Sequence, residues 1–201
     1  MLDYEKKFDK GALIAGCDEA GRGSWAGPLV AACVIMKPDY TNNNINDSKK
    51  LTPKKRDELY KEIIENAVEY QIIVRSVEQI NNSNPKKESQ MAMELGIKNM
   101  KNKPDIVLTD FEKINIDLPQ ENLIKGDSIS FNIAAASILA KVFRDNYMVE
   151  LDKEFSQYDF KNNKGYGTKK HSEALLIHGV NPKIHRVKYK PILKLIKTSN
   201  L

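Results

Sequence analysis

Four acidic residues stand where an apolar strand is expected to end or a helix to begin: Asp18, Glu19, Asp110 and Asp127. The first two follow the apolar stretch 13–17, the third follows 106–109, and the last precedes a long helical pattern. If the two strands are neighbours, the four carboxylates converge at one edge of a sheet. Carboxylates held so close raise one another's pKa unless a cation lies between them. An oxygen-only cluster selects Mg²⁺ or Mn²⁺ rather than zinc, and two such ions can activate water for phosphodiester hydrolysis.

Each acid also has a simpler interpretation. Asp127 stands at a helix start, where it would serve as an N-cap, and Asp110 would simply end its strand in a turn. Side chains alternate between the two faces of a regular strand. Asp18 and Glu19 therefore cannot both face one site unless the chain bends at once at Ala20-Gly21, and otherwise one of the pair is structural. Spacing alone predicts an acidic site without fixing its members.

The elements that would position these acids follow from apolar patterning and from turn residues. Strands are expected at 13–17, 29–35, 70–74 and 106–109, with a short one at 123–124. Helices are expected after Thr52-Pro53, at 88–100, at 129–155 and at 168–178. This order predicts an α/β fold with a mixed sheet flanked by helices. We expect residues 1–158 to form this domain and residues 159–201 to form a small, basic, helical C-terminal region packed on it.

Charge is distributed unevenly along the 201 residues, although the net charge is only +5. Residues 161–201 contain ten Lys or Arg and one acid, whereas the rest of the chain has a slight acidic excess. Concentrated positive charge favours a polyanion such as nucleic acid, and a solvated tail is the alternative. Apolar runs are too short for a membrane span, and Cys17 and Cys33 are expected to be buried thiols rather than a disulfide. We therefore expect a cytoplasmic protein that does not bind membranes.

The stretch GCDEAGRGSWAGPLVAACVI, residues 16–35, resembles the opening motif of ribonuclease HII, the type 2 ribonucleases H. Further matching segments follow in the order found in that family: DSKKL at 47–51, VLTD at 107–110, KGD at 125–127, IAAASILAKVFRD at 133–145, KGYGTKKH at 164–171 and HR at 185–186. A lone GRG would be weak evidence, but the ordered set covers the chain from about residue 14 to residue 186. The resemblance implies a ribonuclease H-like fold.

The resemblance also implies the chemistry. Asp18, Glu19 and Asp110 match metal ligands, and Asp127 completes the site with a second ion that arrives with substrate. Mg²⁺ or Mn²⁺ would be the cofactor, without an organic one. The substrates would be RNA–DNA hybrids and DNA duplexes that contain ribonucleotides. The reaction would be hydrolysis on the 5′ side of a ribonucleotide, leaving a 3′-hydroxyl and a 5′-phosphate.

Six residues match positions that the family uses for substrate: Gly21, Arg22, Gly23, Lys49, Lys50 and Tyr166. The Gly-Arg-Gly turn would read the RNA–DNA junction, since glycines let backbone amides approach a sugar closely and the 2′-hydroxyl distinguishes RNA from DNA. The tyrosine would pack on the deoxyribose that follows the ribonucleotide. Three residues of the long helix either support the site or contact phosphate, and both readings stay open: Ser137, Lys141 and Arg144.

Three departures from the family pattern stand out. Ser24 replaces the proline that usually follows the turn, Phe111-Glu112 stands where the family commonly has glycine, and residues 187–201 do not follow the usual ending. The first loosens the turn, and the second reduces backbone freedom after Asp110. None of them removes one of the four acids, so we expect activity.

Two rival readings remain. Ribonuclease HIII is a related enzyme, but it normally carries an extra N-terminal domain and a different turn after the acidic pair. A catalytically silent nucleic-acid-binding module would use only the basic C-terminal region, yet it would gain nothing from clustered acids unless metals neutralised them. Protein partners cannot be read from the sequence, and a monomer is the default expectation.

Overall fold

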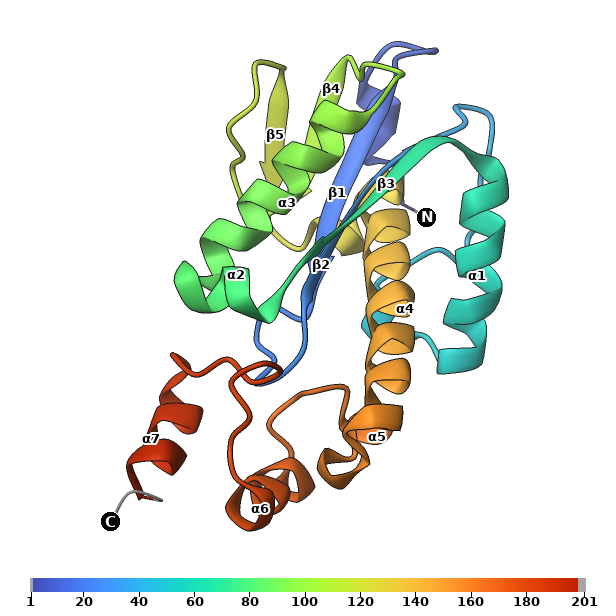
Figure 1. Cartoon of the computed structure of the whole chain (residues 1–201). Coiled ribbons are helices and arrows are strands. Elements are labelled where there is room, and N and C mark those ends of the chain that lie inside the picture. The colour runs from blue at the N-terminus through green and yellow to red at the C-terminus, as the bar shows by residue number, and fades with distance from the viewer. Residues whose placement is uncertain (1, 199–201) are drawn as a thin grey trace.

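The computed structural model describes residues 2–198, and its centre is one five-stranded mixed sheet (Figure 1). The strands are β1 (Ile14–Ala20), β2 (Leu29–Met36), β3 (Ala67–Arg75), β4 (Ile106–Asp110) and β5 (Gln120–Leu123). Their order across the sheet is β3-β2-β1-β4-β5. β2 runs antiparallel to both β1 and β3, whereas β4 runs parallel to both β1 and β5. The predicted α/β class with a mixed sheet is confirmed.

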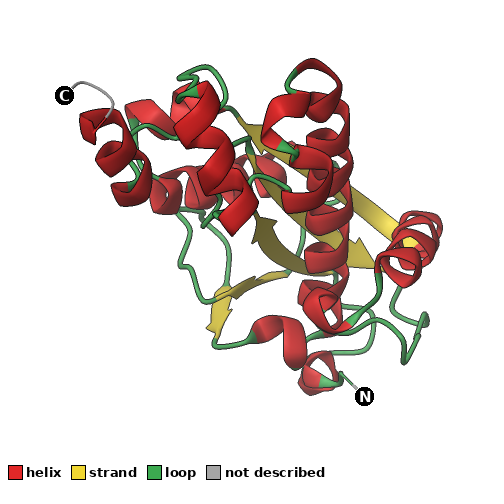
Figure 2. Ribbon diagram, turned by 90° about the horizontal axis from the view of Figure 1, so that it is seen from below, coloured by secondary structure: helices red, strands yellow, loops and turns green. Residues whose placement is uncertain are grey.

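Helices cover both faces of this sheet (Figures 1 and 2). They are α1 (Pro53–Asn66), α2 (Val77–Asn82), α3 (Pro85–Asn99), α4 (Phe131–Glu154), α5 (Phe160–Asn163), α6 (Lys169–His178) and α7 (Lys190–Thr198). One apolar core lies between the sheet and the helices α1 and α4. A second core lies on the opposite face, beneath α2 and α3. The sheet is therefore buried on both sides, which explains why β2 is apolar at every position.

Local capping signals set where the main helices begin. The Thr52 side chain accepts a hydrogen bond from the Lys55 N–H, and Pro53 occupies the first turn of α1. At the start of α4, the Ser130 hydroxyl accepts from the Ile133 N–H. Glu5, from the N-terminal arm, adds a second cap there, because its carboxylate accepts hydrogen bonds from the backbone N–H groups of residues 131 and 132. The N-terminal arm thus holds the helix that follows Asp127.

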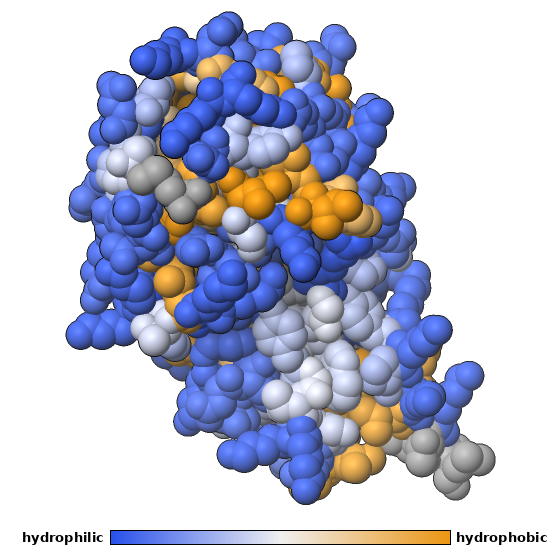
Figure 3. Space-filling model, turned by 180° about the vertical axis from the view of Figure 1, so that it is seen from behind, coloured by the Kyte–Doolittle hydropathy of each residue, from blue (hydrophilic) through white to orange (hydrophobic). Residues whose placement is uncertain are grey.

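Beyond α4 the chain forms the short helices at the lower end of Figure 1. A third apolar cluster packs this region against Ala26, Met148 and their neighbours. Ala26 also forms an isolated antiparallel bridge with His185. The segment after β1 and the C-terminal region therefore support each other. Much of the face shown in Figure 3 is hydrophilic, and within residues 2–198 no helix has the length and apolar content of a membrane span.

Most predicted elements are present, but β3 begins three residues before the predicted 70–74, and α5 and α7 were not among the predicted helices. Three further differences concern β1, α2 and β5. β1 extends three residues beyond the predicted 13–17 and stays regular as far as Ala20, because each of its residues from Ala15 onwards pairs with β2. The helix α2 was not predicted, since its six residues are too few for a periodic pattern, although a complete capping box at Ser76 and Gln79 marks its start. β5 lies at Gln120–Leu123 rather than at 123–124.

Candidate active site

Three of the four predicted acids meet at one edge of the sheet. Asp18 lies near the end of β1, Asp110 ends the neighbouring parallel strand β4, and Asp127 lies in a short 3₁₀ helix at Gly126–Ser128. The register pairs Cys17 with Thr109, so the first two aspartates both follow paired residues at the carboxyl ends of their strands. Carboxylate oxygens of the three residues all lie within 4.8 Å of one another. This distance suits several oxygens around one cation.

Hydrogen bonds fix two of these carboxylates and an ion pair touches the third. Asp110 Oδ1 accepts from the Gly126 backbone N–H at 2.7 Å, which ties β4 directly to the segment that carries Asp127. Asp18 Oδ1 accepts from the backbone N–H of the next residue at 2.7 Å. The exposed Lys49 ammonium lies 3.6 Å from Asp127 Oδ2. The cluster is therefore held in place by its own protein scaffold.

The electrostatics of the cluster favour a bound cation. Burial raises the pKa of Asp18 well above its usual range, and the neighbouring Glu19 and Asp110 carboxylates raise it further. Burial also raises the pKa of Asp110, although the hydrogen bond from Gly126 partly offsets this effect. Such carboxylates hold a proton more readily than isolated ones, and a divalent cation between them would reverse that tendency. A site whose ligands are all carboxylate oxygens suits a hard ion such as Mg²⁺ or Mn²⁺.

Glu19 does not join this trio. Because β1 stays regular, its side chain lies on the α3 side of the sheet, where Oε2 accepts a hydrogen bond from the Ser89 hydroxyl at 2.9 Å. Oε1 lies 3.7 Å from Nη1 of Arg22. Burial raises the pKa of this carboxyl, while Ser89 and Arg22 lower it. The chain turns at Gly21, which has a φ of 86°, but β1 stays paired with β2 as far as Ala20, so the turn comes too late to bring Glu19 to the face of Asp18.

The simpler interpretations of the two other acids can be compared with the geometry. Asp127 does not cap α4, because Ser130 fills that role. Asp110 does end its strand, and the next residue turns the chain: Phe111 has a φ of 66°, unusual for a bulky side chain. The residue is 62% exposed. Phe111, which stands where the family commonly has glycine, therefore occupies a left-handed backbone position. Glycine adopts this conformation without penalty.

The Gly-Arg-Gly turn follows β1 directly, and its two glycines differ. Gly21 has a φ of 86°, and a Cβ there would lie 1.9 Å from Nε of Arg144. Gly23 is exposed, and a Cβ on it would meet nothing within 4 Å. The fold therefore demands glycine at the first position only. At the second, the bare backbone faces open space.

Two buried arginines hold the chain around this turn. Arg144 of α4 donates to the carbonyl oxygens of Ala26 and Pro28. Arg186 donates to the carbonyl oxygens of Arg22 and Gly27. Both guanidinium groups are fully buried. Arg144 was expected either to support the site or to contact phosphate, and its hydrogen bonds are those of a residue that supports the turn. At Ser24 the hydroxyl is buried and has no hydrogen-bond partner among the described residues.

The other predicted substrate residues lie around this edge at differing exposure. Lys49 and Lys50 are exposed in a short 3₁₀ helix that precedes α1. Tyr166 is half-buried, and the cationic groups of Lys141 and Arg144 each lie 5.3 Å from its ring centroid. The tyrosine also lines a cleft of about 550 Å³ between α1, α4 and α5.

The histidines and Trp25 have packing partners. Nε2 atoms of His171 and His185 lie 3.3 Å apart, and each Nδ1 lies 3.0 Å from a backbone carbonyl oxygen. This buried pair joins the segment of Tyr166 to the C-terminal region. The indole of Trp25 lies against Gly167, where a Cβ would come within 2.1 Å of it. Both groups thus stabilise the chain around the turn.

Sequence reasoning missed one side chain beside the site, Ser89, and the partner of a second, Glu112. Ser89 of α3 binds Glu19, and nothing in the sequence around it marks that contact. Glu112 is 2% exposed and accepts a hydrogen bond from Nη2 of Arg22 at 2.6 Å. The sequence indicated this residue as a departure from the family pattern that adds charge near the acidic site, but it did not indicate the pairing with Arg22. The positive φ at Phe111 that turns Glu112 inward is seen only in the structure.

Comparisons with known proteins agree with this geometry. A family model described as "Ribonuclease HII" matches residues 15–192. The ribonuclease HII of Mycoplasma mycoides subsp. mycoides SC is 50% identical over 191 residues, which cover 93% of this chain and 91% of that protein. Among solved structures, ribonuclease H2 from Pyrococcus horikoshii OT3 has a TM-score of 0.80 at 22% identity, with 93% of this chain and 98% of that chain covered.

A ribonuclease HIII, Bst-RNase HIII in complex with Mn²⁺, has the same fold, with a TM-score of 0.76 at 16% identity. The structural match covers 98% of this chain but only 73% of the ribonuclease HIII chain. The family model and the relative that is 50% identical therefore favour ribonuclease HII over ribonuclease HIII. On the acidic cluster, the ordered motifs and these matches, the chain belongs to the ribonuclease HII family and is a ribonuclease H-type endonuclease.

Proposed function

We propose that this enzyme cuts the RNA strand of RNA–DNA hybrids and cuts duplex DNA on the 5′ side of a single embedded ribonucleotide, leaving 3′-hydroxyl and 5′-phosphate ends. One observation carries the proposal: the cluster of Asp18, Asp110 and Asp127 lies at the sheet edge from which the Gly-Arg-Gly turn emerges. A metal-dependent phosphodiester site and a backbone suited to contact a sugar are therefore next to each other.

The donor set fits one or two divalent cations, Mg²⁺ or Mn²⁺. Asp18, Asp110 and Asp127 would hold them, and such ions activate water and stabilise the leaving oxygen of a phosphodiester. The Mn²⁺ complex of the ribonuclease HIII neighbour supports this choice of ion. Glu19, whose carboxylate lies on the other face of β1, stays a predicted ligand: it would have to leave Ser89 to reach an ion beside the three aspartates.

The substrate would lie along the surface that joins the turn to the basic C-terminal region. Gly21 and Gly23 would present backbone amides to the ribose, and the open space at the second glycine leaves room for a sugar. Lys49 and Lys50, both exposed, would pair with phosphates. Tyr166 would pack against the next deoxyribose. Residues 159–201 would act as a basic helical region packed on a catalytic domain of residues 1–158. We further propose a cytoplasmic monomer.

The test is cleavage of an end-labelled DNA duplex containing one ribonucleotide, with Mg²⁺, with Mn²⁺ or with EDTA. A single metal-dependent cut 5′ to the ribonucleotide, with the expected ends, would support the proposal. Asp110→Asn should abolish cleavage and leave duplex binding largely intact. Asp105→Asn is the matched control, because Asp105 lies beside the opposite end of the same strand pair and bonds the Leu13 N–H at 2.8 Å.

Three other results would refute parts of the proposal. Cutting only within a continuous RNA–DNA hybrid would mean that the turn, with Ser24 in place of proline, does not read single ribonucleotides. Binding without cleavage of either substrate would favour the silent nucleic-acid-binding module. Cleavage that persists in Asp110→Asn would contradict the assignment of Asp110 to a metal site.

A further inference from the structure

Glu112 is an unusual residue in this site because it carries a charge and is almost fully buried. It comes two residues after Asp110, and the left-handed backbone at Phe111 separates the two. That conformation sends the phenyl ring outward and the next side chain inward. A buried carboxylate is costly unless it is paired and hydrogen-bonded, so its partners indicate what it does.

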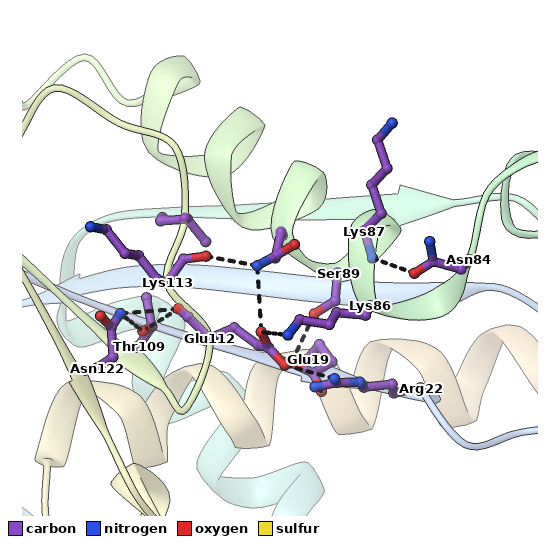
Figure 4. Close-up of polar contacts among 12 residues, drawn as sticks. Glu19, Arg22, Asn84, Lys86, Lys87, Ser89, Thr109, Glu112, Lys113 and Asn122 are labelled. Carbon is purple, nitrogen blue, oxygen red and sulfur yellow. Dashed lines mark hydrogen bonds and ion pairs between the residues drawn. The ribbon is translucent and has the colours of Figure 1, made fainter.

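The carboxylate of Glu112 joins two elements. Oε1 accepts from Nη2 of Arg22 at 2.6 Å, and Oε2 lies 3.5 Å from Nζ of Lys86 and 3.4 Å from Nε2 of Gln90, both on α3 (Figure 4). The arginine comes from the turn after β1, which is far away in the sequence. One buried side chain therefore connects the Gly-Arg-Gly turn to α3.

The backbone of Glu112 is also fixed. Its carbonyl oxygen accepts from Oγ1 of Thr109 at 2.7 Å and from Nδ2 of Asn122 at 3.1 Å. Thr109 lies on β4 directly before Asp110, and Asn122 lies on β5. The carboxylate is thus an anchor on the rigid edge of the sheet beside the metal-site aspartates.

Both terminal nitrogens of the Arg22 guanidinium lie near carboxylates. Its Nη2 bonds Glu112, and its Nη1 lies 3.7 Å from Oε1 of Glu19. The carbonyl oxygen of the same residue accepts from Nη1 of Arg186 at 3.0 Å. The side chain is still 36% exposed, so pairing with two carboxylates reduces the positive charge that it offers a phosphate but does not bury it. A residue held at both its side chain and its backbone fixes the shape of its turn.

We propose that Glu112 is a positioning residue: it holds Arg22 as an internal support of the Gly-Arg-Gly turn, so that the turn meets substrate through its backbone and not through the arginine side chain. The inference rests on the proposed function and deepens it, because it assigns specificity at the junction to a preformed backbone. Glu112 itself would touch neither substrate nor metal.

The experiment compares Arg22→Ala, Glu112→Ala and the double variant on the single-ribonucleotide duplex. Steady-state kcat and KM are measured for cleavage, and binding of the same duplex is measured across a series of salt concentrations in an Asp110→Asn background. Glu112→Gln preserves the side chain's shape and guards against loss of folding. Glu88→Gln is the matched control, because Glu88 is a buried carboxylate that pairs with Nε of Arg75, also at 2.6 Å.

If the pair acts as one support, both single variants lower kcat/KM by a similar factor of about ten to a hundred, the range that misplaced reacting groups produce. The loss falls mainly in KM, and the double variant loses no more than either single one, because the two changes break the same contact. Glu112→Gln retains more activity than Glu112→Ala, and the Glu88 control retains unchanged kcat and KM.

The salt series separates this role from a phosphate contact. The logarithm of the binding constant falls with the logarithm of the salt concentration, and removing one phosphate contact makes this negative slope shallower by about 0.9. An unchanged slope in Arg22→Ala supports the proposal, whereas a slope shallower by that amount overturns it. Losses that multiply in the double variant also overturn it. Failure of the unsubstituted enzyme to cleave would instead refute the proposed function, and the binding series would still decide the role of the arginine.

Discussion

Lowering the pH should destabilise this fold through its buried histidine pair. Burial lowers the pKa of His171 and of His185, the latter to about 4 from a usual value near 6.5. The unfolded chain therefore binds a proton over a pH range in which folded His185 does not. Its contribution to stability is fully present above about pH 6.5 and is lost as the pH falls towards 4. At ~1.36 kcal/mol per pKa unit, the loss amounts to about 3 kcal/mol.

The assay is urea unfolding of the wild type and of His185→Gln at several pH values between 4 and 8. Comparing the two proteins at each pH cancels the contributions of groups that they share, including Asp18, whose raised pKa acts in the opposite direction. The difference in unfolding free energy should be largest at pH 8 and smaller by about 3 kcal/mol at pH 4. His178→Gln, at an exposed position of α6, is the matched control for loss of an imidazole. A difference that does not vary with pH would refute the reasoning.

Three further predictions concern backbone strain, thiols and close packing. Phe111→Gly should be more stable than Phe111→Ala by about 1 kcal/mol in chemical unfolding, since only glycine adopts a positive φ without a Cβ clash; equal stabilities would contradict this. Cys17 and Cys33 are buried and free, and burial raises the pKa of the first thiol, so Ellman's reagent should label neither in the native protein and both in urea; rapid native labelling would contradict their burial. Gly21→Ala should cost about 1–3 kcal/mol of stability because its Cβ would overlap a buried arginine, whereas Gly23→Ala should leave stability unchanged; equal losses in melting experiments would show that the turn is not packed in this way.

The parts of the fold that local patterns control could be predicted from the sequence. Thr52 and Thr168 cap helices where their residue types indicate, because a cap needs only a side chain and the next few backbone N–H groups. Asp110 was placed at a strand end by the apolar run before it. The convergence of Asp18 and Asp110 required only that two strands be parallel neighbours, which the strand order provides.

The parts that depend on tertiary geometry could not be predicted. The side of the sheet on which Glu19 lies depends on how far β1 remains paired with β2, and no local signal sets that length. Asp127 was predicted both as a member of the acidic site and as a helix cap, and the contact that ties its segment to Asp110, the hydrogen bond from Gly126, had no signal in the sequence. The burial of Glu112 depends on one positive φ and on a partner 90 residues away.

The most direct test of the central claim is anomalous diffraction from crystals of the enzyme soaked in Mn²⁺. The account predicts a Mn²⁺ peak bounded by carboxylate oxygens of Asp18, Asp110 and Asp127, the groups that lie within 4.8 Å of one another. A fully occupied peak elsewhere, with these three carboxylates binding no ion at saturating Mn²⁺, would contradict it.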